Sequence, residues 1–342
     1  MSEGPFAGQH TAERRRAMLR TAMGPTIAAA LADPLVIEIM VNPDGHLWLD
    51  RLGEGRRDSG AYYDAAQVER IIRLVASHAR GEVHAGAPII SAELPPHGEG
   101  VGERFEGVLP PVSLAPCFAI RKPAAKIYRL ADYVRDGIMT PVMAAHLADG
   151  VAGRCNILVV GGTSSGKTTL ANALLAEMAQ LNERVILIED TRELQCAAPD
   201  VVALRTRTSA AGCADTVTMA DLVRSTLRLR PDRIVVGEVR GGEALDMLKA
   251  WNTGHPGGIA TLHANSAIAA LYRLEALVHE SVVTVPRRLI AEAIDRVVFI
   301  AGRGRARRIE TILSVDGLDA NGAYDLTDLT PPQPDPTLRR LS

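Results

Sequence analysis

The chain has 342 residues, a length that favours about two domains, and 47% of its residues are hydrophobic against 23% charged, which excludes wholesale disorder. Its formal net charge of -2 and its 4% of aromatic residues argue against direct nucleic-acid binding, which uses basic surfaces and stacking side chains. Its four cysteines are widely spaced without a CxxC pair, so neither a zinc site nor a disulfide framework is predicted.

Residues 1–22 are polar and rich in arginine, and we expect a flexible tail or the first turn of a helix. No apolar stretch reaches the roughly 18 residues that a membrane-spanning helix needs, so we expect a cytoplasmic protein. The three arginines Arg14–Arg16 leave a contact with anionic lipid as the alternative to a solvated tail.

Residues 23–125 predict a small α+β domain with an antiparallel sheet. Helices are expected over Ile27–Leu31 and over Ala65–Ala79, where apolar residues recur at helical spacing. Short apolar runs bounded by turn residues predict strands at Val36–Met40, His46–Leu49, around Ile89, Arg104–Leu109 and Cys117–Ile120. Residues 126–140 lack a clear pattern and are predicted to form a linker.

Residues 141–316 alternate buried strands with helices, which predicts an α/β domain with a parallel sheet flanked by helices. The expected strands are Asn156–Val160, Arg184–Ile188, Arg233–Val236 and Ile259–Leu262. The expected helices are Lys167–Met178, Met219–Leu227 and Glu243–Thr253. A hairpin is expected near the end of the chain, with strands at Arg307–Ser314 and Ala323–Leu326 on either side of the turn Asp319–Gly322. A proline-rich tail follows it. Residues 317–342 are predicted to form a segment separate from the α/β domain.

One motif carries most of the functional prediction, because it fits GxxxxGK[ST] between an apolar strand and a helix. It consists of Gly161, Gly162, Thr163, Ser164, Ser165, Gly166, Lys167 and Thr168, and Thr169 follows as a further expected cofactor-binding residue. In such a loop the backbone amides surround a phosphate, the lysine reaches the β- and γ-phosphates, and the final hydroxyl faces Mg²⁺. The motif therefore predicts ATP and Mg²⁺ as cofactors.

Two further strands end in acids, at the sheet edge where open α/β sheets bind ligands. Glu189 and Asp190 follow one strand, and a carboxylate there can hold Mg²⁺ through water or orient the attacking water. Glu238 follows another and is the best candidate for activating water near the γ-phosphate. The alternatives are a solvated strand-end acid and, for Glu238, a pair with Arg240 or Arg233.

Two histidines flank the strand Ile259–Leu262, and His255 lies in a Gly/Pro loop. The position of His263 suits sensing of the γ-phosphate or contact with a neighbouring subunit, with structural packing as the alternative. No second ligand stands at zinc-like spacing, so no metal is implied for these histidines.

The four blocks, in this order, resemble the secretion ATPases that serve type IV secretion, type II secretion and type IV pili. Three further segments, 32–40, 227–233 and 249–258, are most similar to the members of this family that act in conjugal transfer. The resemblance implies a homo-hexameric ring whose subunits bind ATP between an N-terminal domain and a RecA-like C-terminal domain. It also implies a place at the cytoplasmic face of the inner membrane, with inner-membrane components of a conjugation or type IV secretion apparatus as partners.

The resemblance also assigns roles to single residues. It makes Glu238 the catalytic acid and, with Thr168, a metal ligand; Glu189 supports it, and His263 belongs to a histidine block. Arg104 and Arg121 correspond to arginines that reach the nucleotide phosphates, with surface or strand-pairing arginines as the alternative. The chain departs from the family at Ser164, where glycine is usual, and a positive φ there costs a serine ~1 kcal/mol.

The expected function is therefore an ATP hydrolase that powers conjugal DNA transfer, type IV secretion or pilus assembly. A motor for pilus retraction or type II secretion uses the same chemistry for different work. A DNA translocase is a less favoured function, because the charge and aromatic content argue against it. A scaffold that binds ATP without turnover is also compatible with the motifs.

Overall fold

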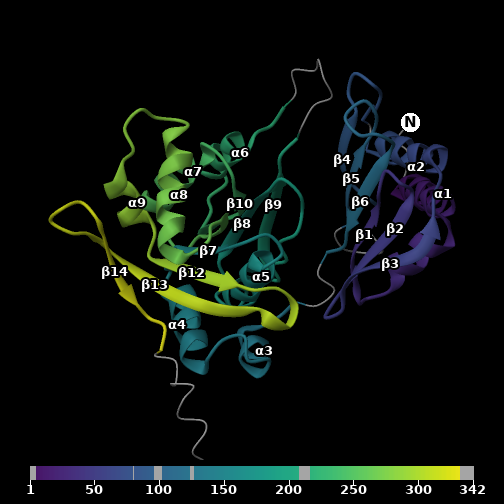
Figure 1. The fold of residues 1–342 in the computed structure, drawn as a ribbon. Helices are drawn as coiled ribbons and strands as arrows, with labels where there is room; N and C mark the ends of the chain where they lie inside the picture. The colour runs from purple at the N-terminus through teal and green to yellow at the C-terminus, as the bar shows by residue number, and fades with distance from the viewer. Residues whose placement is uncertain (1–4, 80, 96–101, 124–126, 208–215, 332–342) are drawn as a thin grey trace, which may run out of the picture. The chain divides into compact units, whose positions relative to one another are not determined.

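The computed structural model describes residues 5–79, 81–95, 102–123, 127–207 and 216–331 (Figure 1). The described chain forms two compact units, each with its own sheet. Of the described residues, the first unit contains those up to 123 together with Thr216, and the second contains 127–207 and 217–331. The fold is therefore mixed α/β, as the alternation of elements predicts.

The first unit is a six-stranded antiparallel sheet with the order β3-β2-β1-β6-β5-β4. Its strands are β1 (Val36–Val41), β2 (His46–Arg51), β3 (Gly55–Tyr62), β4 (Ile89–Glu93), β5 (Arg104–Val108) and β6 (Cys117–Arg121). Alternate residues of β1 and β6, such as Ile39 and Ile120, are buried in a core with helices α1 (Pro5–Ala32) and α2 (Ala65–His78). The predicted α+β composition and antiparallel pairing are both present.

A flexible tail is predicted for residues 1–22, but the structure has a helix there. Helix α1 begins at Pro5 and continues to Ala32 through a kink at Gly24. Leu19 and Met23 are buried in the core of the first unit. Leu19 and Met23 are four residues apart, the spacing of a helix face, in a segment whose arginine-rich composition obscured that signal. The Tyr63 hydroxyl donates to the Met23 carbonyl over 2.9 Å, next to the kink.

The second unit is built on an eight-stranded sheet with the order β14-β13-β12-β7-β11-β10-β8-β9. The strands are β7 (Ile157–Gly161), β8 (Arg184–Glu189), β9 (Asp200–Arg205), β10 (Arg233–Val239), β11 (Ile259–His263), β12 (Arg296–Ala301), β13 (Arg308–Leu318) and β14 (Tyr324–Asp328). The six strands from β12 to β9 are parallel, and β13 and β14 extend the sheet with antiparallel pairing. The predicted hairpin is thus an extension of this sheet rather than a separate segment.

Both faces of the parallel sheet are covered by helices. On β7, Leu158 and Val160 join one buried cluster while Ile157 and Val159 join another. The first cluster includes residues of α6 (Met219–Thr226), α7 (Glu243–Asn252), α8 (Ala267–His279) and α9 (Arg287–Ala293). The second includes residues of α3 (Leu130–Arg135), α4 (Pro141–Ala152) and α5 (Lys167–Met178). Burial on both faces explains the continuous apolar runs that identify these strands in the sequence.

The segment predicted to be a linker, 126–140, differs from that expectation, because it contains helix α3. Leu130, Tyr133 and Met139 are buried in the core of the second unit. The strands β3, β9 and β12 and the helices α4, α8 and α9 are also additions to the predicted elements. The solvent-exposed edge strand β3 lacks apolar alternation, which removes the signal that identifies a strand.

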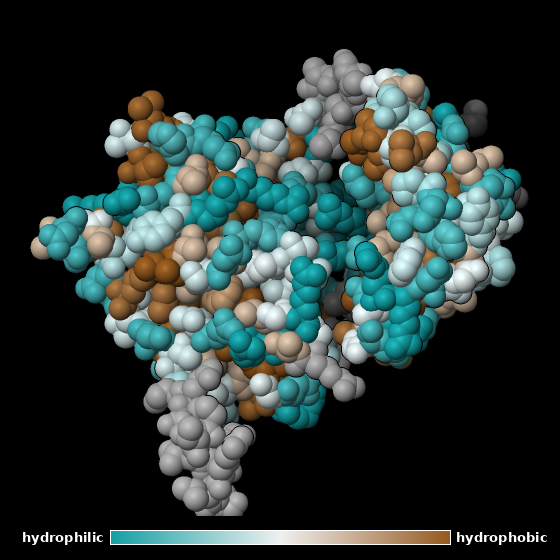
Figure 2. Space-filling model, viewed as in Figure 1, coloured by the Kyte–Doolittle hydropathy of each residue, from teal (hydrophilic) through white to brown (hydrophobic). Residues whose placement is uncertain are grey.

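Among the described residues, no helix is long and apolar enough to cross a membrane. The visible surface carries apolar side chains in separate small groups among polar ones (Figure 2). The expected proline-rich tail, 332–342, lies outside the described residues.

Candidate functional site

The GxxxxGK[ST] motif forms the loop between β7 and α5. Gly166 is the residue before the helix, in the left-handed conformation with φ +100°, and no side chain caps this helix end. Helices α2, α4, α6 and α8 have a side-chain cap at this end, whereas α3, α7 and α9 lack a side-chain hydrogen bond there, as α5 does. An uncapped N-terminus leaves amide groups and the positive end of the helix dipole available to an anion.

The residues of this loop differ in exposure. Gly161 and Ser165 are buried, whereas Gly162, Thr163 and Ser164 are exposed. Thr168 and Thr169 lie half-buried in the first turn of α5. The Ser165 hydroxyl is buried without a hydrogen-bond partner in the described part of the chain.

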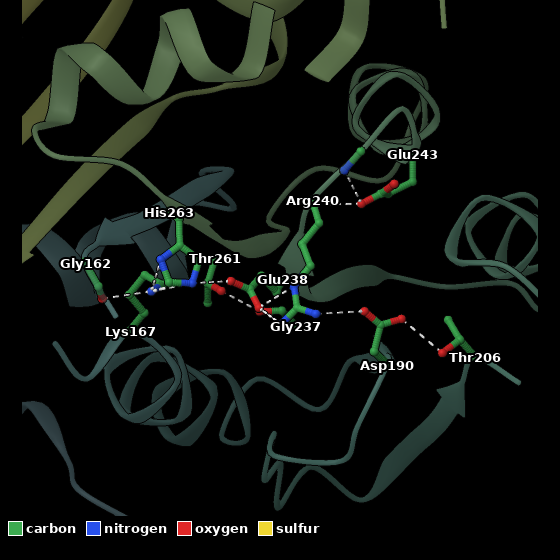
Figure 3. Close-up of polar contacts among 11 residues, drawn as sticks. Gly162, Lys167, Asp190, Thr206, Gly237, Glu238, Arg240, Glu243, Thr261 and His263 are labelled. Carbon is green, nitrogen blue, oxygen red and sulfur yellow. Dashed lines mark hydrogen bonds and ion pairs between the residues drawn. The ribbon is translucent and has the colours of Figure 1, made fainter. Parts of the chain in front are cut away.

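Lys167 is 8% exposed and its ammonium group turns back over the loop. Its Nζ atom donates to the Gly162 carbonyl over 3.1 Å and lies 3.3 Å from His263 Nδ1 (Figure 3). These two contacts hold the ammonium group of Lys167 within the loop. A phosphate bound in the loop would therefore contact this positive charge.

Glu238 lies on the other side of His263 (Figure 3). Its Oε1 atom is 2.7 Å from His263 Nε2, and its Oε2 atom accepts a hydrogen bond from Arg240 Nε over 2.8 Å. Burial and the charge of Lys167 lower the pKa of His263, against the opposing effect of Glu238. A neutral imidazole can accept from Lys167 on one nitrogen, while its other nitrogen stays in close contact with the Glu238 carboxylate.

Parallel pairing explains why these three residues meet. In the sheet, β7, β11 and β10 are neighbours, and His263 pairs in register with Gly161. The carboxyl ends of parallel strands lie at one edge, so the phosphate loop, His263 and Glu238 gather there although they are far apart in sequence. His255 lies at the opposite end of β11, where its Nδ1 is 3.0 Å from the Pro231 carbonyl.

Arg240 also belongs to this group of contacts, although the sequence pattern suggests it only as an alternative partner of Glu238. It contacts Glu238 through two nitrogens, and its Nη1 is 3.7 Å from Asp190 Oδ2. The Asp190 Oδ1 atom in turn accepts from the Thr206 hydroxyl over 3.0 Å. Arg233, the other partner considered for Glu238, is buried at the beginning of β10, where it pairs with Glu183.

Glu189 is 3% exposed, and its carboxylate folds back onto its own following loop. Its Oε1 atom accepts from the amides of Glu193 and Leu194, each over 2.8 Å. Burial raises the pKa of Glu189 to about 7, although these two amides oppose the rise. A Cβ on Gly237 would lie 2.9 Å from Glu189 Cγ, so Glu189 packs against β10 one residue before Glu238.

Ser164 has a φ of 60°, the left-handed conformation that the comparison with glycine anticipated. A β-branched residue at such a φ is a genuine outlier, whereas glycine adopts it without a Cβ penalty. This loop therefore stores backbone strain at an exposed position.

We expect Ser164→Val to be less stable than Ser164→Gly by about 1–2 kcal/mol, because of the left-handed backbone. The measurement is urea-induced unfolding of the full chain followed by circular dichroism. Thr163→Val serves as the matched control, since this neighbouring exposed residue has no positive φ. Equal stability of the valine and glycine variants at 164 would contradict the left-handed conformation.

Arg104 and Arg121 belong to the first unit, where they are direct cross-strand partners on β5 and β6. Glu38 stands opposite Arg121 on β1. Burial raises the pKa of Glu38, and the charges of Arg121 and Arg104 partly oppose that rise. Two like charges that face each other across neighbouring strands repel. The single carboxylate of Glu38 offsets only part of the repulsion between Arg104 and Arg121.

Metal ligands are sparse in the described part of the chain, where no group of three or more His, Cys, Asp and Glu side chains could hold a metal ion. Mg²⁺ at a phosphate site usually takes one or two protein ligands, with phosphate oxygens and waters completing its shell. The Thr168 hydroxyl and the Glu238 carboxylate are hard oxygen donors of that kind. The donor set fits Mg²⁺ bound together with phosphate, and not a dedicated metal cage.

Comparison with known proteins gives consistent results. The family model described as Type II/IV secretion system protein matches residues 27–302. The probable conjugal transfer protein TrbB of Sinorhizobium fredii is 48% identical over 310 residues, covering 90% of this chain and 91% of that protein. The conjugal transfer protein TrbB of Rhizobium radiobacter is 46% identical over 305 residues, covering 89% and 91%.

A solved structure is similar in fold. The crystal structure of the pilus retraction motor PilT with bound ADP aligns with a TM-score of 0.56 at 20% sequence identity. The alignment covers 88% of this chain and 80% of that one.

Proposed function

The chain belongs to the Type II/IV secretion system protein family, and on that premise we propose that it is an ATP hydrolase powering conjugal DNA transfer and assembly of its pilus. Its second unit acts in this proposal as a RecA-like P-loop ATPase domain. The two relatives described above, both conjugal transfer proteins, favour this work over pilus retraction or type II secretion. The likeness to the retraction motor supports only the fold.

The observation that carries the proposal is the contact chain at the carboxyl edge of the parallel sheet. Lys167 lies in an uncapped phosphate loop, and His263 joins its ammonium group to the Glu238 carboxylate. A phosphate-binding cation and a candidate base are thus separated by one imidazole. This is the pair of groups that hydrolysis of a terminal phosphate requires.

In the proposed reaction, phosphate oxygens of ATP replace the Gly162 carbonyl and His263 as partners of Lys167. Glu238 accepts a proton from a water molecule as the water oxygen bonds to the γ-phosphorus, and the bond from that phosphorus to the β-phosphate oxygen breaks. ADP and inorganic phosphate leave. Glu189, whose pKa of about 7 allows proton exchange near neutral pH, supports Glu238 from the adjacent strand.

Thr168 and Glu238 are the residues that would hold Mg²⁺. When bound, the ion neutralises charge on the phosphate oxygens. The amide groups of Gly162 to Thr169 and the ammonium group of Lys167 hold the phosphates in the orientation for in-line attack.

We propose a ring of six subunits, in which Arg104 and Arg121 act on nucleotide phosphates. The repulsion between these cross-strand arginines supports the assignment, because an anion between two guanidinium groups relieves it.

The proposed place of work is the cytoplasmic face of the inner membrane, against inner-membrane components of the conjugation apparatus. Family membership supports this location. Arg14–Arg16 are candidates for a contact with anionic lipid.

The proposal is tested by phosphate release measured over a range of protein concentrations, with size-exclusion light scattering on the same samples. We expect turnover that needs Mg²⁺, stops with a chelator, and rises in step with the hexamer fraction. The reason is that the hexameric ring is the active form in this proposal.

Two results would favour a different function. A hexamer that binds ATP without releasing phosphate would favour the nucleotide-gated scaffold. Turnover stimulated by single-stranded DNA, with a steep dependence on salt, would favour a DNA translocase.

A further inference from the structure

The loop between β12 and β13 lies beside the phosphate loop and brings an arginine to it. A Cβ built on Gly166 would lie 2.9 Å from Arg307 Nε and 3.0 Å from Arg307 Cζ. The guanidinium group of Arg307 therefore packs on the bare face of Gly166, the residue directly before Lys167. Any side chain at 166 would also need the unfavourable φ of +100°.

The β12–β13 loop is held in place at both ends. The amide of Arg307 donates to the Gly304 carbonyl over 3.3 Å, closing a short 3-10 turn, η1 (Gly304–Ala306). The amide of Ile309 donates to the Ile138 carbonyl over 2.8 Å, which ties the beginning of β13 to the segment after α3. The position of Arg307 is thus set by backbone contacts on its two sides.

Arg307 has no acidic partner in the described part of the chain. The neighbouring Arg308 pairs with Glu310, whereas Arg307 Nε is buried and without a hydrogen-bond partner among the described residues. The nearby Tyr133 hydroxyl is also buried without one. Burial raises the pKa of Tyr133 and Arg307 opposes that rise, so this phenol stays neutral and supplies no countercharge.

A partly buried guanidinium without an anion destabilises the fold, because it loses hydrogen bonds to water and gains no hydrogen bonds to a carboxylate in return. Here the missing anion has an obvious position, since the loop that Arg307 touches is the one with an uncapped helix N-terminus and Lys167. Arginine forms paired hydrogen bonds with phosphate oxygens, which a lysine cannot imitate.

We propose that Arg307 is a further phosphate-binding residue of this site, donating to the nucleotide's phosphates alongside Lys167. The inference rests on the proposed function, because it requires that the loop binds a nucleotide. It adds a second cation, supplied from β12–β13 within the same unit, to the one that the sequence motif identifies.

The test is isothermal titration of the full chain with MgADP and, separately, with inorganic pyrophosphate. We expect Arg307→Gln to weaken both ligands at least tenfold, because the glutamine keeps most of the side-chain length but loses the charge. Arg307→Lys should recover part of the loss. Arg303→Gln is the matched control: it removes the same charge from the same loop at an exposed position, and we expect less than a twofold change.

The outcomes distinguish the two levels of inference. A native chain that does not bind MgADP overturns the proposed function. If the native chain binds MgADP and Arg307→Gln binds it equally well, only the role of Arg307 is overturned. The same conclusion follows if Arg307→Gln loses affinity for MgADP but not for pyrophosphate. Equal weakening in the glutamine and lysine variants, with a lowered unfolding temperature in both, indicates a purely structural arginine and also overturns it.

Discussion

Replacing Lys167 with alanine is expected to abolish ATP turnover, with a fall of more than about a hundredfold. The ammonium group is the cation at the centre of the loop, held by the Gly162 carbonyl and His263. Alanine removes the charge that binds the β- and γ-phosphates and stabilises the charge that develops on them. The measurement is steady-state phosphate release at saturating MgATP.

The control for this variant is Lys249→Ala, which removes an exposed lysine from the last turn of α7 and should keep native turnover. Because Lys167 is buried, the alanine variant also needs a native circular-dichroism spectrum and native oligomer mass. A folded Lys167→Ala variant with near-normal turnover would refute the assignment of this loop as the ATP site. Lys167→Arg should also be inactive, since its larger planar group cannot occupy the place of a compact ammonium.

The second large effect is expected from Glu238→Gln, which should bind MgATP and fail to hydrolyse it. Glutamine keeps the size of the side chain and its contacts with His263 and Arg240, but it cannot accept a proton from water. Loss of a general base typically costs about 10²–10⁴ in rate. A filter assay with radiolabelled ATP, followed by chromatography of the retained nucleotide, should find ATP in the variant and ADP in the native chain.

Glu280→Gln provides the comparison for Glu238→Gln, because it neutralises an exposed carboxylate at the end of α8. It should retain ADP after turnover, which is also the result expected for the native chain. If Glu238→Gln also retained ADP, another group would have to activate the water. Glu189 would then be the next residue to substitute, since its raised pKa suits a base near neutral pH.

The site residues that could be identified from the sequence are those whose signal is local. The phosphate loop is contiguous, and Glu238 and His263 each lie at the end of a predicted buried strand, which makes them candidates without a structure. The same local signals predicted the alternation of strands and helices in the second unit. They were weaker where charge masks the pattern, as in α1, or where a strand is exposed, as in β3.

Other features depend on contacts that no local pattern contains. Helix α3 contributes Leu130 and Tyr133 to a core whose other members follow it in the chain, which is why its short segment resembles a linker. The pairing of Arg240 with Glu238 and Asp190 needs two strand ends to be brought together. The contact of Arg307 with Gly166 needs β12, which is far from β7 in the sequence, to pair beside it, so that the β12–β13 loop lies against the phosphate loop.

The sequence by itself therefore determined the chemistry available to this protein: a phosphate loop with one of the chain's four lysines, and acids and a histidine at the ends of buried strands. Hydrophobic periodicity and backbone requirements act over a few residues, so they can be read without the fold. Only the tertiary structure decided which of these groups meet. Parallel pairing aligned the carboxyl ends of β7, β11 and β10, and that alignment joined Lys167, His263 and Glu238 at one edge of the sheet.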